Sequence, residues 1–233
     1  MIEVCFDIET KKFFEEIESR DPAGLGISII SVLRREIDVD GKIIREEMKS
    51  FWDPSTSHSA SLMAGSGQVR PEHEKKLPFS TKQEMDLMWR WFGEADRIIG
   101  FNSLGFDVPA LAPIYPNGDF KKLPHFDIIV KVKEAFGKRV SLQAIVKETL
   151  GETKTASGGD AVEYWAKGDS ESLEKLKRYC EKDVEATMKV YDYGLKNGKL
   201  RFKDHWNELR EIEVDFSYPR VVPKSDDLQM DLF

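Results

Sequence analysis

Polar and apolar side chains alternate along residues 2–9 of the chain, which reads IEVCFDIE. A strand with this alternation places its apolar side chains on one face and Cys5, Asp7 and Glu9 on the other. Two carboxylates on one face of a hydrophobic strand repel each other and lose hydration when partly buried, so the arrangement is costly without a cation. Because hard oxygen ligands suit magnesium or manganese, this strand has the character of half a metal site.

The residues after the first strand predict a mixed α/β fold. Two β-rich runs, 26–37 and 42–52, flank an Asp-Gly turn and predict an antiparallel hairpin. A helix follows over residues 81–95, with a capping box at Ser80 to Gln83. Its apolar stripe is Met85, Met88, Trp89 and Phe92.

The second half of the chain predicts one further strand and then a layer rich in helices. Residues 96–102 form the strand, and residues 126–136 and 141–151 predict short helices. Residues 171–195 form a long helical pattern, and residues 199–216 predict a two-stranded appendage. Ser141 is placed to cap the second short helix, and Gly151 is placed to end it.

Two more acidic residues, elsewhere in the sequence, are candidates to complete the metal site that Asp7 and Glu9 begin. Asp107 follows the predicted strand at a turn rich in Gly and Ser. Asp183 lies four residues after Tyr179 in the long helical pattern, so their side chains share a face about 5–6 Å apart.

These residues, taken together, resemble the DEDD superfamily of 3′–5′ exonucleases, which have an RNase H-like α/β fold with a mixed sheet flanked by helices. The first motif of that family is D-x-E, here Asp7 and Glu9. The second is an Asn a few residues before an aromatic–Asp pair, here Asn102 and Phe106–Asp107. Each motif alone is weak, and their order along the chain gives the resemblance its strength.

The third motif of the family distinguishes two subclasses. It ends in Asp, preceded either by Tyr at the fourth position back or by His at the fifth. Here Asp183 has Tyr179 at the fourth position and Arg178 at the fifth, so the chain resembles the tyrosine subclass. The matched segments span roughly four-fifths of the chain.

The resemblance implies a centre with two Mg²⁺ or Mn²⁺ ions. It implies that Asp7 bridges both ions, that Glu9 and Asp183 complete the site that activates water, and that Asp107 holds the other ion. Tyr179 would orient the attacking water.

The resemblance also implies substrate contacts. Thr10 lies where family members contact the terminal nucleotide, and Asn102 and Phe106 would line the substrate path, Phe106 by stacking. Lys154, in a polar loop, is a candidate phosphate contact, although an exposed loop lysine needs no function.

Each site residue has a structural alternative. Asp107 before Val-Pro is equally typical of a helix cap. Considered alone, Asp183 is most typical of a solvated helix charge, and Tyr179 and Phe106 of packed aromatics. The four histidines are widely spaced and show no metal-ligand pairing.

Composition is consistent with one enzymatic domain. The chain has 233 residues, 40% of them hydrophobic, and no run of about 18–20 apolar residues. We therefore expect no membrane partner and a cytoplasmic location. Cys5 and Cys180 predict neither a disulfide framework nor a zinc site.

The net charge of −7 argues against a protein that coats nucleic acid, but a nuclease needs only a local basic funnel. Short basic stretches are candidates for that funnel, although each is more typical of a solvated face. They are Lys11–Lys12, Lys121–Lys122, 131–133 and Lys138–Arg139.

The last five residues, Gln229, Met230, Asp231, Leu232 and Phe233, follow a polar stretch and end in two large apolar side chains. They resemble the bacterial sliding-clamp-binding motif. In such a peptide the last two side chains fill a hydrophobic pocket while the glutamine fixes orientation. The alternative is a tail that packs on its own domain.

The sequence thus predicts an exonuclease domain over residues 1–216 and a flexible tail over residues 217–233. We expect a metal-dependent 3′–5′ exonuclease that acts on the 3′ ends of DNA, since clamp tethering favours DNA. An RNA-trimming exonuclease is the enzymatic alternative, and a non-catalytic DNA or clamp adaptor with the same fold is the other.

Overall fold

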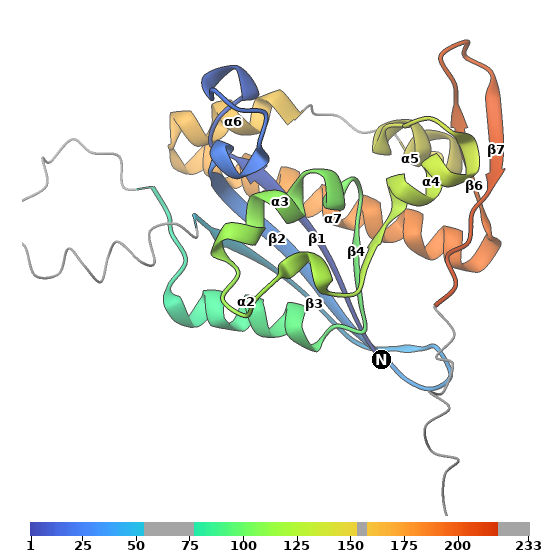
Figure 1. Cartoon of the computed structure of the whole chain (residues 1–233), viewed down its shortest axis with the longest axis horizontal. Coiled ribbons are helices and arrows are strands. Elements are labelled where there is room, and N and C mark those ends of the chain that lie inside the picture. Colours follow the sequence, from blue (N-terminus) through green and yellow to red (C-terminus); the bar gives the residue numbers. More distant parts are fainter. Residues whose placement is uncertain (54–76, 153–157, 219–233) are drawn as a thin grey trace, which may run out of the picture.

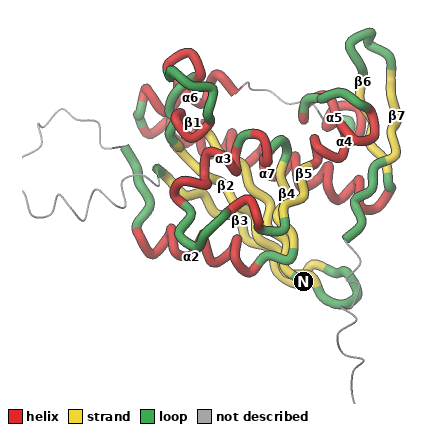
Figure 2. Tube along the Cα trace, in the orientation of Figure 1, coloured by secondary structure: helices red, strands yellow, loops and turns green. Residues whose placement is uncertain are grey.

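The computed structural model describes residues 1–53, 77–152 and 158–218, in which strands form a central group surrounded by helices (Figure 2). Among these residues, none of the helices combines the length and the apolar character needed to cross a bilayer. The mixed α/β architecture predicted from the sequence is confirmed.

The core of the fold is a five-stranded sheet in the order β3-β2-β1-β4-β5 (Figure 1). The central strand, β1 (Ile2–Thr10), runs antiparallel to β2 (Ile27–Ile37) and parallel to β4 (Arg97–Gly100). Antiparallel pairing adds β3 (Ile43–Trp52) outside β2, and parallel pairing adds β5 (His125–Asp127) outside β4. The strand with the D-x-E motif is therefore the middle of the sheet.

Both faces of β1 are covered by side chains of other elements. Val4, Phe6 and Ile8 pack into one apolar cluster with side chains of the helix after β3. Cys5, on the opposite face, packs into a second cluster that includes side chains of the long C-terminal helix. The predicted division of this strand into an apolar face and a face with carboxylates is confirmed.

The helix after β3 is α2 (Lys82–Glu94), and the predicted stripe of methionines and aromatics is buried. Its capping box begins one residue later than predicted. The Thr81 hydroxyl accepts a hydrogen bond from Glu84 N, and the Glu84 carboxylate accepts one from Thr81 N. The predicted box at Ser80–Gln83 is therefore wrong. Ser80 Oγ instead accepts a hydrogen bond from Trp52 N at 2.9 Å, which fastens the entry to α2 onto β3.

Within the described residues, five more helices complete the layers (Figure 1). The long helix α7 packs across β1 and β2, with α5 and α6 against it, while α2 and α3 contribute to the cluster on the other face. Their bounds are α3 (Asp107–Leu111), α4 (Ile128–Phe136), α5 (Leu142–Leu150), α6 (Gly158–Lys167) and α7 (Ser170–Asn197). Short 3-10 helices lie at Phe14–Glu16, Pro22–Leu25, Ser103–Gly105, Ala112–Ile114 and Phe120–Lys122.

The start of α4 differs from the sequence prediction for a physical reason. Residues 126–136 predict one helix, but its first residues belong to β5, and the Asp127 side chain caps α4 by accepting from Ile129 N at 3.0 Å. In α5, capping by Ser141 and termination at Gly151, which has a φ of 72°, are both confirmed. Helix α6 was not predicted.

The C-terminal hairpin pairs β6 (Lys199–Lys203) with β7 (Leu209–Glu213) in a sheet of its own. The predicted two-stranded element is confirmed. Its inner side chains, Leu200 and Phe202, are fully buried in the same cluster as residues of α5 and α7. The base of the hairpin is thus part of the core, while its turn projects beside α4 and α5 (Figure 1).

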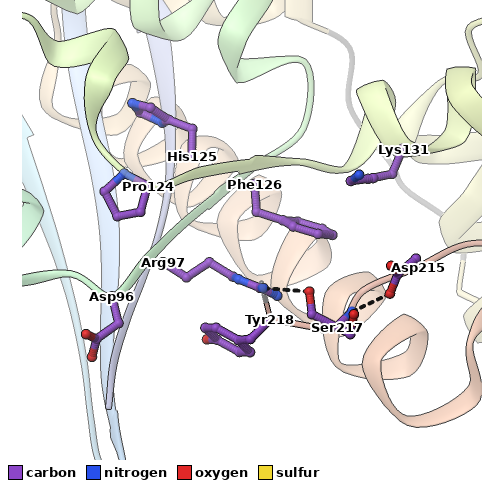
Figure 3. Close-up of a pocket in the computed structure, with 9 residues that line it drawn as sticks. All are labelled: Asp96, Arg97, Pro124, His125, Phe126, Lys131, Asp215, Ser217 and Tyr218. Atoms are coloured by element: carbon purple, nitrogen blue, oxygen red, sulfur yellow. Dashed lines mark hydrogen bonds between the residues drawn. The ribbon is translucent and has the colours of Figure 1, made fainter. Parts of the chain in front are cut away.

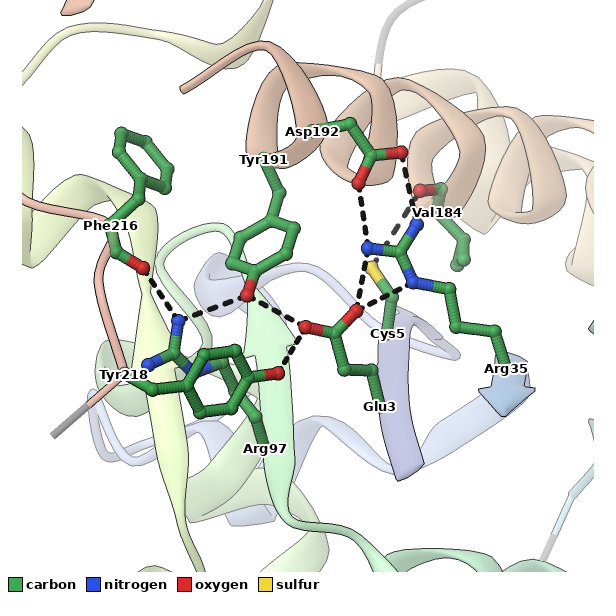
Figure 4. A network of polar contacts seen from close by, with 9 residues as sticks. All are labelled: Glu3, Cys5, Arg35, Arg97, Val184, Tyr191, Asp192, Phe216 and Tyr218. Carbon is green, nitrogen blue, oxygen red and sulfur yellow. Dashed lines mark hydrogen bonds and ion pairs between the residues drawn. The ribbon is translucent and has the colours of Figure 1, made fainter. Parts of the chain in front are cut away.

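A buried ionic network lies on the α7 side of β1 (Figure 4). The fully buried Glu3 accepts from Arg35 Nε at 2.5 Å and from the Tyr191 hydroxyl at 2.8 Å, and Tyr218 also donates to it. Arg35 in turn donates to both carboxylate oxygens of Asp192, at 3.0 and 2.6 Å. Each buried charge therefore has a charged or hydroxyl partner, as burial demands.

Arg97 extends this network to the segment that follows β7. It donates to the Tyr191 hydroxyl at 2.9 Å and to the carbonyls of Phe216 and Ser217, both at 2.8 Å. The Tyr218 ring lies over its guanidinium, 3.4 Å from ring centroid to Cζ. The carbonyl contacts bind the chain after β7 to the start of β4.

Close packing of Phe216 on α7 gives a test of this arrangement. A Cβ added at Gly194 would lie 2.3 Å from the Phe216 ring, so we expect Gly194→Ala to lower the free energy of unfolding by about 1–3 kcal/mol through overpacking. Gly93 in α2 has no atom within 4 Å of the same position, so Gly93→Ala should stabilise by about 0.5–1 kcal/mol through helix propensity. Urea unfolding measures both, and equal effects of the two substitutions would refute the packing argument.

Candidate metal centre

Three carboxylates meet where the central strand faces the long helix. Oxygen atoms of Asp7, Glu9 and Asp183 all lie within 4.8 Å of one another. We call these three residues the acidic cluster. Asp7 and Glu9 come from β1 and Asp183 from α7, so the structure brings together residues from the first and third sequence motifs.

The local fold explains this convergence. Asp7 and Glu9 lie on the β1 face that carries Cys5, and α7 packs on that face. The register of β1 against β2 shifts between Glu9 and Thr10, where the strand is irregular. On α7, Asp183 lies one turn after Tyr179, and both are buried.

Asp107, the fourth predicted acid, approaches β1 from the β4 side. Parallel pairing of β1 with β4 covers only Glu3 to Cys5, and β4 ends at Gly100. Beyond that point Asp107 Oδ1 accepts a hydrogen bond from Ile8 N at 3.1 Å. The carboxylate thus partners a β1 amide at a position where β4 no longer lies alongside.

Asp107 is the first residue of α3 and is only 4% exposed. Burial raises the pKa of its carboxyl group to about 7, the hydrogen bond from Ile8 N opposes the rise, and the charge of Asp127 adds to it. The group is therefore poised between protonation states, and a nearby cation would favour the ionised form. The simple helix-cap alternative does not account for its contact with β1.

The turn between β4 and α3 places Asp107, and the buried carboxylate of Asp127 holds that turn. Asp127 Oδ1 accepts from Asn102 N at 2.8 Å and Oδ2 accepts from Leu104 N at 3.0 Å. Gly100 permits the tight start of the turn, since a Cβ there would lie 2.3 Å from Ser103 Oγ. Sequence analysis missed Asp127; its position at a strand end, just before a helix, was the available signal.

Tyr179 lies among the negative charges of the acidic cluster. Burial, together with the charges of Asp183, Glu9 and Asp7 and a hydrogen bond with Asp183, raises the pKa of its hydroxyl group above the usual value of 10. In the protein without metal the phenol therefore stays neutral and keeps its proton. A neutral hydroxyl can both donate and accept a hydrogen bond, so it can hold a water molecule.

The structure shows where three predicted substrate contacts lie. Thr10 is buried, and its hydroxyl donates to Lys12 O at 3.0 Å. Asn102 has a left-handed backbone, with φ of 64°, and its side-chain oxygen accepts from Arg139. Phe106 is half-buried, 6.0 Å from the Phe14 ring centroid. Their roles toward a substrate stay predictions.

Two predicted contacts lie outside the described residues: Lys154 and the terminal residues Gln229, Met230, Asp231, Leu232 and Phe233. The structure therefore does not test their roles.

Aromatic and cationic side chains flank the acidic cluster. The Trp52 and Trp165 rings stack with centroids 6.4 Å apart, and Lys11 Nζ lies 5.6 Å from the Trp165 ring centroid. Lys11 also pairs with Asp53 at 2.6 Å. The predicted basic stretch at Lys11 is thus part of a packed group beside β1.

The donor set fits a hard divalent cation. Three carboxylates this close repel one another unless a cation neutralises them, and carboxylate oxygens are preferred ligands of Mg²⁺ and Mn²⁺. The neighbouring thiol of Cys180 donates to Asp7 O at 3.4 Å, and burial raises the pKa of this thiol well above its usual value. The three residues of the acidic cluster all offer carboxylate oxygens, the ligand type that hard cations prefer.

A separate pocket of about 480 Å³ lies at the other end of β4 (Figure 3). Arg97, at the start of β4, lines it, whereas the acidic cluster includes the later part of β1, which runs parallel to β4. Its cations have protein partners: Arg97 binds backbone carbonyls and Lys131 donates to Glu134 at 3.0 Å. The pocket is not part of the candidate metal centre.

We expect Asp127→Ala to damage the turn that positions Asp107. It removes the acceptor of Asn102 N, Leu104 N and Ile129 N, and each amide left buried without a partner costs about 1–3 kcal/mol. Urea unfolding should show this loss of stability, and amide NMR shifts should change at residues 102–107. The control Asp119→Ala removes an exposed cap of Lys121 N and should cost about 1 kcal/mol or less; equal losses would contradict the assigned role.

Comparison with solved structures gives low identity and partial coverage. The family B DNA polymerase from the hyperthermophilic archaeon Pyrobaculum calidifontis has a TM-score of 0.51 and 20% sequence identity, over 83% of this chain and 24% of that chain. E. coli Exonuclease I in complex with a dA16 oligonucleotide has a TM-score of 0.46 and 14% identity, over 84% of this chain and 41% of that one. The polymerase likeness is evidence of a shared fold. No curated protein matched the chain by sequence.

A protein-family model provides the assignment. The model described as RNase_H superfamily matches residues 56–194, which is more than half of the 233-residue chain. The matched range contains Asp107, Tyr179 and Asp183, while β1 with Asp7 and Glu9 lies before it. With a β1-centred mixed sheet and helices on both faces, the chain belongs to the RNase H superfamily.

Proposed function

We propose that the chain is a metal-dependent nuclease that removes nucleotides from the 3′ ends of DNA. The observation that carries this proposal is the acidic cluster, in which oxygens of Asp7, Glu9 and Asp183 lie within 4.8 Å of one another on an RNase H-superfamily domain. The polar geometry around it, with Asp107 bound to β1 and Tyr179 beside Asp183, is consistent with the same chemistry.

In this proposal Asp7, Glu9 and Asp183 hold divalent cations, and Asp107 contributes to a second cation position. Bound Mg²⁺ or Mn²⁺ would supply Lewis-acid stabilisation of the charge on the scissile phosphate and a lower pKa for a bound water. Asp7 suits a shared ligand because it lies on the central strand, next to Ile8, whose amide binds Asp107.

The chain's own residues then position the reactants. Tyr179 holds the attacking water through its hydroxyl group, and Asp183 orients Tyr179 through their hydrogen bond. The water oxygen bonds to phosphorus, the bond from phosphorus to the 3′ oxygen of the preceding nucleotide breaks, and that oxygen takes up a proton. One nucleoside 5′-monophosphate leaves, and the shortened strand keeps a 3′ hydroxyl group.

The proposed 3′–5′ direction and the DNA substrate rest on two resemblances, that of the three acidic motifs and that of residues 229–233. The D-x-E, Asn–Phe–Asp and Tyr–Asp motifs resemble those of 3′–5′ exonucleases, and residues 229–233 resemble a sliding-clamp-binding peptide. We infer that the tail recruits the enzyme to a bacterial sliding clamp, which encircles DNA. An RNA-trimming activity is the competing outcome of the experiment below.

The decisive experiment follows single-stranded DNA and RNA of one sequence, labelled at either end, with Mg²⁺, Mn²⁺ or EDTA. We expect a ladder of shortening products from the 5′-labelled DNA, early release of a mononucleotide from the 3′-labelled DNA, and no digestion in EDTA. Digestion that persists in EDTA or begins at the 5′ end would overturn the proposal. Faster digestion of RNA than DNA would assign the RNA-trimming activity instead.

Two substitutions separate metal ligands from the water-orienting residue. Asp7→Asn should reduce turnover by about 10²–10³-fold and weaken Mn²⁺ binding measured by calorimetry, because a Lewis acid contributes several kcal/mol. Tyr179→Phe should reduce turnover by about 10–100-fold and leave Mn²⁺ affinity unchanged, because it removes only a hydroxyl group. The control is Asp119→Asn, which changes an exposed carboxylate that is not part of the acidic cluster. Normal turnover in either site variant would sink the role given to that residue.

The tail proposal has its own test. Deletion of residues 229–233, or replacement of Leu232 and Phe233 with Ala, should abolish binding to a purified bacterial sliding clamp in a titration. Each of these side chains contributes about 1.5–3 kcal/mol when fully buried. Ordering a flexible peptide on binding costs free energy and keeps the affinity low, so loss of either anchor is sufficient. Equal affinity of the full-length and shortened proteins would exclude the tail from the interface; a drop in thermal stability on deletion would indicate packing on the domain.

A further inference from the structure

A highly exposed tryptophan stands at the turn of the C-terminal hairpin. Trp206, between β6 and β7, is 66% exposed. The imidazole of His205 lies against it, with ring centroids 3.4 Å apart, and Lys138 Nζ lies 5.3 Å from its centroid. A single exposed aromatic ring is common on protein surfaces, so it is the cation beside Trp206 that points to a ligand.

The acids of this turn are engaged within the turn itself. The Asp204 side chain is 1% exposed and accepts from Trp206 N at 2.9 Å, Glu208 N at 3.1 Å and Arg210 Nε at 2.7 Å. Glu208 pairs with Arg210 at 2.5 Å. These contacts rigidify the turn, and Arg210 offsets part of the negative charge of Asp204 and Glu208. Lys138, whose Nζ lies beside the Trp206 ring, and its chain neighbour Arg139 are cations outside this turn.

Those cations connect the hairpin to the candidate metal centre. Lys138 and Arg139 are exposed and occupy the loop between α4 and α5. Arg139 donates to the side-chain oxygen of Asn102, in the turn that leads into Asp107. One short loop therefore spans from the turn beside the metal centre to Trp206, on the side where the hairpin stands beside α4 and α5 (Figure 1).

We propose that Trp206, Lys138 and Arg139 bind the upstream nucleotides of a single-stranded nucleic acid whose 3′ end lies at the acidic cluster. Lys138 and Arg139 would contact phosphates, and Trp206 would stack on a base. The combination of an exposed aromatic ring with adjacent cations is the recurrent design for binding single strands without sequence preference. This proposal rests on the nuclease function proposed above, and it extends the substrate contacts beyond the terminal nucleotide.

Two arguments favour a single strand as the occupant. This hairpin exposes Trp206 and Leu209, which is 59% exposed, among charged neighbours, whereas a protein partner of ordinary affinity needs a larger apolar surface. A base pair inside a duplex has both faces covered by stacking, so its bases cannot stack on Trp206. An exposed tryptophan at a turn therefore suits the unpaired bases of a single strand.

The test measures affinity in EDTA, where no strand is digested. Fluorescence anisotropy compares labelled DNA strands of about 4 and about 16 nucleotides, the range of site sizes for single-strand binders. We expect Trp206→Ala to weaken binding of the longer strand by about 5–150-fold and to affect the shorter strand less. Trp206→Phe should retain part of the affinity, because it keeps a smaller ring.

Two further readouts separate a direct contact from a structural effect. Strand binding should quench tryptophan emission in the wild type more than in Trp206→Phe, which keeps the other four tryptophans. Lys138→Gln should reduce the slope of log affinity against log salt by about 1. The matched controls are Ile44→Ala, an exposed apolar residue on β3, and Lys42→Gln beside it; neither should change affinity or slope.

The outcomes distinguish this surface from the nuclease proposal. Wild-type affinity for the longer strand in both Trp206 variants would overturn the surface, even if the wild type digests DNA. Loss of affinity in Trp206→Ala that is equal for both lengths, without the difference in quenching, would also overturn it. Failure of the wild type to digest any strand, with length-dependent binding through Trp206, would overturn the nuclease and leave the surface standing.

Discussion

The hydrogen bond from the Ile8 amide to the Asp107 carboxylate is the contact on which the candidate centre depends most directly. It joins the central strand to α3 where pairing with β4 has ended, and it spans 99 residues of sequence. Asp127 supports it from behind by fixing the turn that carries Asp107. Both carboxylates are buried, and the hydrogen bonds that they accept from backbone N–H groups offset the free-energy cost of removing them from water. The same hydrogen bonds fix the position of Asp107.

The elements that could be predicted are those with a strong local pattern. Alternation along β1, the Asp-Gly hairpin, the α2 stripe and the long α7 all follow from spacing and turn chemistry, and the structure confirms them. The three motifs named Asp7, Glu9, Asp107, Tyr179 and Asp183, and the structure brings the first pair to Asp183 while the Ile8 contact holds Asp107 nearby. Two errors fell at boundaries, where the cap moved from Ser80 to Thr81 and β5 took the start of a predicted helix, and one helix, α6, was missed.

The buried polar partners could not be predicted, because their pairing is set by tertiary packing. Glu3 lies on the same face of β1 as Asp7, yet its partners Arg35 and Tyr191 come from β2 and α7, with no local spacing to signal them. Arg97 likewise reads as a strand residue and becomes the anchor for the chain after β7. The same strand face thus carries a neutralised acid at one end and an acidic cluster at the other.

The wide separation of the acidic residues along the chain has a consequence for biosynthesis. The thiol of Cys180 touches the carbonyl of Asp7 across 173 residues, so the central strand must wait for α7 before the cluster exists. Such non-local closure is slow and occurs late in folding. A nascent chain that has not yet gained α7 would carry β1 without its helix, and the proposed metal centre would stay incomplete until that helix was synthesised and packed.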